Sequence, residues 1–151
     1  IVKTAAMARQ IREEDVISMK DWQVQKLGTF KITALPDKDS KGTPYPQRLC
    51  FLVEAGAFRL FHSGDSNGAD QSLKGKAERL DLAMTHSFYT DEFLQTLMPR
   101  KLLLLDNGRF EPGRFMINAD CEKLKTELQP RYPETEILIP PPNHWITLPQ
   151  T

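Results

Sequence analysis

Cysteine, net charge and long apolar runs are all scarce in this 151-residue chain, and each scarcity excludes a class of protein. Two cysteines are too few for the disulfide framework of a small secreted domain. Basic and acidic residues number 20 each, so the formal net charge is +0 and offers no electrostatic footprint for nucleic acid or an anionic membrane. No apolar run approaches the roughly 18 residues of a membrane-spanning helix. We therefore expect a cytoplasmic protein with no nucleic acid and no membrane among its partners.

Familiar catalytic motifs are missing too. The chain contains no Gly-x-Ser-x-Gly, no P-loop and no Gly-x-Gly-x-x-Gly. It is 40% hydrophobic and 26% charged, a composition typical of globular proteins, and its length suits one domain but not two. We therefore expect residues 1–151 to form a single domain. The opening Ile1-Val2-Lys3-Thr4 has no initiator Met and no signal pattern, so we expect a fragment, a processed product or an incompletely recorded chain.

Apolar periodicity predicts a mixed α/β chain, with hairpins in the first half and alternating strands and helices in the second. Phe30, Ile32 and Ala34 alternate with polar residues, as in a half-buried strand, and Pro36 is expected to end that strand. The other predicted elements are a helix at Ala5–Ile11, strands at Val16–Met19, Arg48–Glu54, Phe58–His62, Leu80–Met84, Leu102–Leu105, Ile137–Ile139 and Trp145–Leu148, a loop at Asp37–Pro46, and helices that begin near Asp91 and at Asn118.

The sharpest candidate for chemistry is Asp65, where the predicted strand Phe58–His62 runs into Gly64-Asp65-Ser66. A rigid sheet can aim a carboxylate at a strand end, and the two carboxylate oxygens can ligate one cation or bridge two. The alternative is that Gly64-Asp65 is an ordinary turn in which the aspartate caps local backbone amides. The dipeptide alone leaves both interpretations open.

The order of elements from Lys26 to Ser66 resembles the metallo-β-lactamase superfamily, in particular its UlaG-like and phospholipase-D-like branch of metal-dependent hydrolases. In that family a strand, a Pro-x-x-His loop, a hairpin and a strand ending in Gly-Asp-Ser/Thr follow one another. Three later stretches resemble the family's remaining strands, namely Glu78–Met84, Pro99–Leu105 and Pro133–Pro140. The resemblance implies an α/β fold that is one half of an αββα sandwich, with a mixed sheet and flanking helices.

The chain departs from the family at most of the metal ligands. The His-x-His-x-Asp-His cluster, which would lie upstream of Ile1, is absent. By the resemblance, Asp39 stands at the Pro-x-x-His position and Asp106, or else Asn107, at the last ligand position, and only Asp65 matches outright. Asp39 and Asp106 fit an ordinary loop or turn equally well. His86, in Thr-His-Ser-x-Tyr, is a candidate ligand or proton carrier, although the same stretch also fits the start of a helix. The resemblance thus implies Asp39, Asp65 and Asp106 as metal ligands, with Asp65 and His86 as catalytic residues.

Such a ligand set implies a divalent ion. It would be Zn²⁺ as in the family or, because carboxylate oxygens favour harder cations, Mn²⁺ or Mg²⁺. The implied function is metal-dependent hydrolysis of an ester, phosphoester or amide in a small-molecule substrate. The alternative is a catalytically inactive module of the same fold that binds a small molecule or a protein. In either case we expect an apolar sheet face that packs against the missing N-terminal half or a second copy of the chain.

Overall fold

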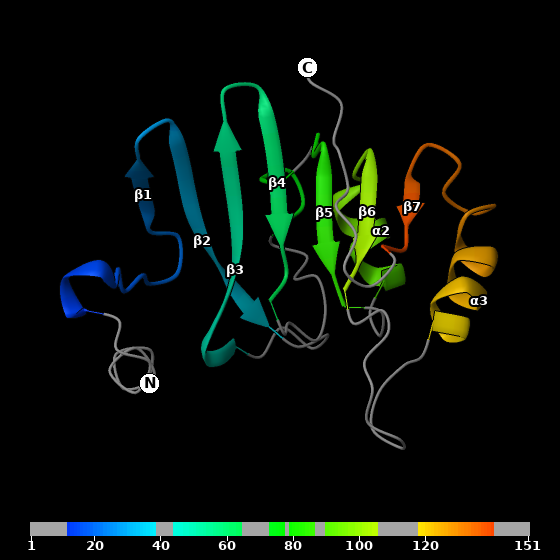
Figure 1. The fold of residues 1–151 in the computed structure, drawn as a ribbon, viewed down its shortest axis with the longest axis horizontal. Helices are drawn as coiled ribbons and strands as arrows, with labels where there is room; N and C mark the ends of the chain where they lie inside the picture. Colours follow the sequence, from blue (N-terminus) through cyan, green and yellow to red (C-terminus); the bar gives the residue numbers. More distant parts are fainter. Residues whose placement is uncertain are drawn as a thin grey trace.

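The computed structural model describes residues 12–38, 44–64, 73–77, 79–86, 90–105 and 118–140, which form one mixed sheet with helices packed against it (Figure 1). The described elements are η1 (Glu13–Asp15), β1 (Val24–Leu27), β2 (Phe30–Lys38), β3 (Pro44–Ala55), β4 (Phe58–His62), β5 (Leu82–Thr85), α2 (Thr90–Leu97), β6 (Lys101–Leu104), α3 (Asn118–Leu128) and β7 (Glu136–Leu138). The strands lie side by side in chain order, from β1 at one edge to β7 at the other.

The sheet changes character at β4. Strands β1 to β4 form an antiparallel meander, and the tight turns of the β1–β2 and β3–β4 hairpins contain Gly28 and Gly56 with positive φ angles of 58° and 59°. From β4 to β7 every neighbouring pair is parallel, and α2 and α3 lie in the β5–β6 and β6–β7 connections. As a result β2, β4, β5, β6 and β7 all run in the same direction.

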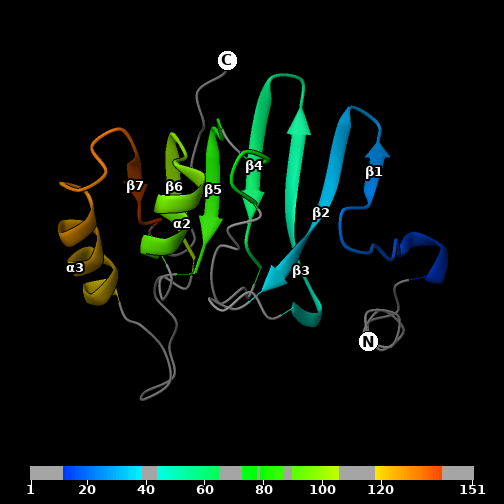
Figure 2. The same ribbon diagram turned by 180° about the vertical axis from the view of Figure 1, so that it is seen from behind.

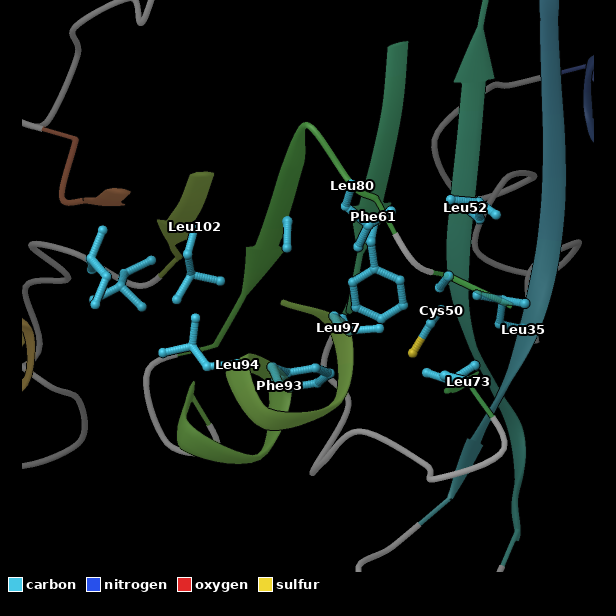
Figure 3. Packing of buried hydrophobic residues seen from close by; sticks show 14 of the residues in the cluster. Leu35, Cys50, Leu52, Phe61, Leu73, Leu80, Phe93, Leu94, Leu97 and Leu102 are labelled. Carbon is cyan, nitrogen blue, oxygen red and sulfur yellow. The ribbon is translucent and has the colours of Figure 1, made fainter. Parts of the chain in front are cut away.

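One face of the sheet, the closed face, is covered and dry. Helix α2 lies over β5 and β6, and α3 lies near β7 (Figure 2). Phe93, Leu94 and Leu97 of α2 point toward sheet residues that include Phe61 and Leu102 (Figure 3). The rings of Phe61 and Phe93 are tilted, with centroids 5.8 Å apart. The buried strand residues of this face are Leu35, Cys50, Leu52, Phe61, Ala83, Leu102, Leu104 and Ile137.

The opposite face, the open face, is also apolar at its centre but only partly buried. Because side chains alternate along a strand, the residues between the closed-face positions point the other way. In β2 to β4 they include Ile32, Phe51, Val53, Leu60 and His62, which are of intermediate exposure, whereas Ala34 is buried. A sheet that is apolar on both faces is the pattern of a layer between two others.

The prediction that Pro36 ends its strand is wrong. Strand β2 continues to Lys38, and Pro36 pairs with Leu49 of β3. Ala34 makes both of its backbone hydrogen bonds to the chain leading into β1. The ring nitrogen of Pro36, two residues further along β2, also points toward the β1 side of the strand. The pairing of β1 with β2 does not extend as far as Pro36. No ladder hydrogen bond to β1 is lost there, so proline is tolerated, and the predicted loop Asp37–Pro46 shortens at both ends.

Two further expectations concern the N-terminal part. Val16–Met19 is not a strand, because the chain there pairs with no neighbour; Ile17 and Met19 line a groove on the open face instead. Strand β1 was not predicted, since its central residues Gln25 and Lys26 are those of a solvated edge. The predicted helix Ala5–Ile11 and strand Trp145–Leu148 lie outside the described residues. None of the helices in the described part of the chain has the length and apolar character that a membrane crossing requires.

Candidate functional site at the carboxyl edge of the sheet

The five strands that share a direction end at one edge of the sheet, the carboxyl edge. The arrowheads of β2, β4 and β5 mark it at the lower side of Figure 1. In α/β sheets, ligands bind in the region outside the carboxyl ends of the strands. Helix α2 follows β5 and precedes the parallel strand β6, so its N-terminus also lies toward this edge.

The closed face turns from apolar to polar as it reaches the carboxyl edge. Asp37, Ser63 and Thr85 are 2%, 1% and 0% exposed. Each stands two residues after an apolar closed-face residue of its own strand, so each points into the same interior. Buried polar groups cost free energy unless they have partners, which makes three of them at one edge a feature that needs an explanation.

The partners of these three side chains differ. Asp37 Oδ2 lies 3.9 Å from Nη1 of Arg48, an ion pair between neighbouring strands. Ser63 Oγ donates a hydrogen bond of 3.1 Å to the carbonyl of Gly64. The Oγ1 atom of Thr85 has no hydrogen-bond partner within the described ranges, although its backbone carbonyl accepts a 2.8 Å bond from the amide of Leu105. Thr85 is therefore an orphan hydroxyl at this edge.

The end of β4 is a rigid turn that leads directly into Asp65. The amide of Gly64 donates to Nδ1 of His62 at 2.8 Å, and Cys50 Sγ donates to the carbonyl of Ser63 at 3.4 Å. Gly64 has a φ of 57°, where any side chain is strained, and a Cβ there would lie 3.5 Å from the carbonyl oxygen of Leu49. Glycine before the candidate carboxylate thus has a local conformational reason.

Three of the four predicted site residues, Asp39, Asp65 and Asp106, lie outside the described residues. Each comes directly after a described residue at the carboxyl edge: Lys38, Gly64 and Leu105. The topology therefore brings the chain segments that lead into all three to one side of the sheet. Whether their carboxylates converge stays a prediction. Within the described ranges no group of three or more His, Cys, Asp and Glu side chains could hold a metal ion.

The fourth predicted residue, His86, follows β5 directly and is half-buried at the same edge. Its carbonyl oxygen accepts a 3.3 Å hydrogen bond from Thr90 Oγ1 at the start of α2. This bond joins the end of β5 to the first turn of the helix, which agrees with the expected helix start. The role of His86 as a ligand or proton carrier stays a prediction.

Sequence reasoning missed the buried polar group of the edge. Local sequence predicts a loop at Asp37, because Pro36 is expected to end the strand. Extending the two-residue alternation of Thr33 and Leu35 through the proline would have placed Asp37 on the closed face. The periodicity was the available signal, and it outweighed the proline here.

Near the start of α2 a second polar cluster, the Asp91 cluster, fixes the helix. Asp91 accepts hydrogen bonds from Tyr132 at 2.6 Å, Arg131 at 3.0 Å and Gln95 at 3.2 Å. Burial raises the pKa of Asp91, but the hydrogen bonds from Tyr132 and Arg131 outweigh it and hold that pKa below its ordinary value. Burial and the bond to Asp91 raise the pKa of Tyr132. The cluster joins α2 to the chain after α3.

The sequence matches no protein-family model and no curated protein. Solved structures, however, share the fold. The metallo-β-lactamase fold protein YhfI from Bacillus subtilis superimposes on 82% of this chain with a TM-score of 0.58 at 16% identity, over 52% of its own chain. CmlA, a diiron β-hydroxylase from Streptomyces venezuelae, superimposes on 89% of this chain with a TM-score of 0.60 at 13% identity, over 35% of its own chain.

A third similar structure is a proposed Zn-dependent hydrolase of the metallo-β-lactamase superfamily from Thermotoga maritima. It matches 70% of this chain with a TM-score of 0.53 at 12% identity, over 57% of its own chain. At such identities the likeness shows the fold alone. The chain thus has the mixed sheet and helices of the metallo-β-lactamase fold, as the sequence predicted, and spans between about a third and three fifths of each of these structures.

Proposed function

We propose that this chain is the C-terminal half of a metal-dependent hydrolase of the metallo-β-lactamase superfamily, close to its UlaG-like and phospholipase-D-like branch. The observation that carries the proposal is the carboxyl edge: strands β2, β4 and β6 end there, each one to three residues before a candidate carboxylate. The structures that share the fold include a diiron β-hydroxylase and a proposed Zn-dependent hydrolase, which supports a metal-dependent function.

The residues of this chain have separate roles in the proposal. Asp39, Asp65 and Asp106 would hold a divalent ion, for which a set of carboxylate oxygens is suitable chemistry, with Mn²⁺ favoured over Zn²⁺ by oxygen ligands. When bound, the ion would activate water and polarise the ester, phosphoester or amide of a small-molecule substrate. The rigid turn at Gly64 would aim Asp65, and His86 would carry a proton at its imidazole.

A catalytically inactive module of the same fold is the second candidate. It is favoured by the carboxylates Asp39 and Asp106, which by the resemblance stand at positions where the family has histidine. Such a module would keep the sheet and use it to bind a small molecule or a protein. The two candidates differ in one measurable property, the stoichiometric binding of a divalent ion.

Two measurements on the purified product of the complete gene distinguish the hydrolase from the inactive module: its metal content and the dependence of its stability on metal. We expect about one or two ions per chain by elemental analysis, and a gain of about 2.7 kcal/mol in the free energy of unfolding at a metal concentration of 100 Kd. Asp65→Ala should remove the gain and leave the stability of the metal-free protein nearly unchanged.

The matched control is Asp21→Ala, since Asp21 is an exposed aspartate before β1 and is not among the candidate ligands. It should keep both the metal and the gain. Metal-free protein whose melting temperature does not respond to Mn²⁺, Zn²⁺ or Mg²⁺ would instead establish the inactive module.

A further inference from the structure

The turn that ends β4 is held by side chains as well as by the sheet. The amide of Ser63 donates to the carbonyl of Met84 at 2.9 Å, and the Ser63 carbonyl accepts from Cys50 Sγ at 3.4 Å. The amide of Gly64 donates to Nδ1 of His62 at 2.8 Å, and the Gly64 carbonyl accepts from Ser63 Oγ at 3.1 Å. All four backbone polar groups of these two residues therefore have partners, and the path of the chain through the turn is fixed.

The bond from Gly64 to His62 is the shortest of the four, and it joins a side chain to the amide two residues ahead. A side chain that accepts this amide stabilises a turn, as aspartate and asparagine do in Asx-turns. The acceptor is the lone pair of Nδ1, so the ring is neutral and carries its proton on Nε2. Because Gly64 has left-handed backbone geometry, with a φ of 57°, the turn depends on local bonds of this kind.

Packing alone is a poor explanation for a histidine at this position. The His62 side chain is half-buried on the open face, in a groove whose other side chains are apolar except for Gln25. Its cross-strand partner is Phe51. An aliphatic or aromatic side chain would fill the position without taking a polar ring out of water. The hydrogen bond from Gly64 accounts for the imidazole where packing does not.

We propose that His62 is a positioning residue for the candidate ligand Asp65. Nδ1 of His62 holds Gly64 in the turn, and the turn sets the direction in which the chain enters Asp65. Residues that orient a metal ligand affect metal affinity without contacting the ion, and their loss typically weakens binding about 10- to 100-fold. The inference rests on the proposed function, since it takes Asp65 to be a ligand.

The hydrogen bond itself can be measured by NMR on the product of the complete gene, without any metal ion. In the wild-type protein we expect a scalar coupling across the bond, between the amide nitrogen of Gly64 and Nδ1 of His62. The Gly64 amide should exchange with solvent at least about fivefold faster in His62→Phe, which keeps an aromatic ring but has no acceptor. In His62→Asn, whose Oδ1 can accept the same amide, the exchange rate should stay near that of the wild type.

Metal affinity then tests the positioning role in the same protein. The Kd for Mn²⁺ should rise at least about tenfold in His62→Phe and stay within about threefold of the wild-type value in His62→Asn. Leu60→Ala is the matched control, because Leu60 lines the same groove two residues earlier in β4 and contributes none of the hydrogen bonds of the turn. This variant should bind Mn²⁺ as the wild type does.

Absence of the coupling in the wild-type protein would overturn the proposal, and this result does not depend on the folding of any variant. A His62→Phe variant that binds Mn²⁺ as tightly as the wild type would also overturn it. So would a His62→Asn variant that binds as weakly as His62→Phe, since the acceptor would then not be the property that matters. Wild-type protein that binds no divalent ion would refute the proposed function and with it the role toward a ligand, while the coupling would still show whether His62 holds the turn.

Discussion

The two faces of the sheet are made of similar residues but differ in what covers them. On the closed face, Leu52 of β3 and Phe61 of β4 are 5% and 0% exposed. On the open face, Phe51 and Val53, which flank Leu52 in β3, remain partly exposed. The covering helix is the source of the difference: Phe93, Leu94 and Leu97 of α2 meet the closed face (Figure 3). Apolar sequence thus determines which face can be buried, while the covering element determines which face is buried.

The comparison implies an uneven distribution of stability. A side chain whose apolar surface is fully removed from water contributes about 25 cal/mol per Å² of that surface, and its loss also leaves a cavity. The closed face has both contributions within this chain. Side chains on the open face are only partly removed from water in this chain. We therefore expect them to contribute little to the stability of the isolated chain.

The largest expected effect is a difference between two phenylalanines. Phe61→Ala, on the closed face, should lower the free energy of unfolding by about 3–5 kcal/mol, because the ring is 0% exposed and packs on Phe93. Phe51→Ala, on the open face of the neighbouring strand, should cost about 1–2 kcal/mol. Urea denaturation of the 151-residue chain gives both values. Equal losses would mean that the open face is already covered.

Most of the fold was predictable from alternation and turn residues. The β3–β4 hairpin around Gly56, strand β6 and helix α3 follow directly from local sequence. Strand β1 did not, because an edge strand with Gln25 and Lys26 lacks the apolar alternation of a buried one. The strand end predicted at Pro36 was wrong for a long-range reason. A proline is tolerated in β2 only because β1 does not pair with that position, and no local sequence pattern shows where β1 stops.

The candidate site was predictable only as a set of strand ends. Sequence indicates that Gly64-Asp65 and Leu105-Asp106 follow strands, but the common edge depends on the parallel pairing of β4, β5 and β6. Pairing of distant strands is set by the covering helix and the whole sheet. Asp39, Asp65 and Asp106 lie outside the described residues, so their role as ligands remains a prediction. Thr85 was missed because a threonine at a strand end is unremarkable until its burial is known.

A smaller effect should come from the Asp91 cluster, which joins α2 to the chain after α3. Tyr132→Phe removes the 2.6 Å hydrogen bond to Asp91 and keeps the ring, so we expect a loss of about 1 kcal/mol or less, since the Asp91 side chain is 41% exposed. The folded-state pKa of Asp91 is lowered from 3.8. The stabilisation is therefore fully present above that ordinary value and is lost as the pH falls through the lower folded value.

Urea midpoints of the wild type and the Tyr132→Phe variant, compared between neutral pH and about pH 2.5, measure this dependence. The difference between the two proteins should narrow on acidification. A difference that stays constant over that range would show that the hydrogen bond does not depend on the charge of Asp91.

The smallest expected effect concerns Thr85, where the closed face becomes polar. Thr85→Val exchanges an orphan buried hydroxyl for a methyl group of the same shape, so the free energy of unfolding should rise by about 0–1 kcal/mol. Thr135→Val is the matched control: Thr135 is also buried, but its Oγ1 donates to the carbonyl of Pro99 at 2.6 Å, and its loss should cost about 1 kcal/mol or more. Opposite signs for the two threonines would separate an unpaired hydroxyl from a structural one. A Thr85→Val loss as large as that of Thr135→Val would mean that the hydroxyl at the carboxyl edge has a partner outside the described residues, and that this end of the closed face is closed by polar contacts.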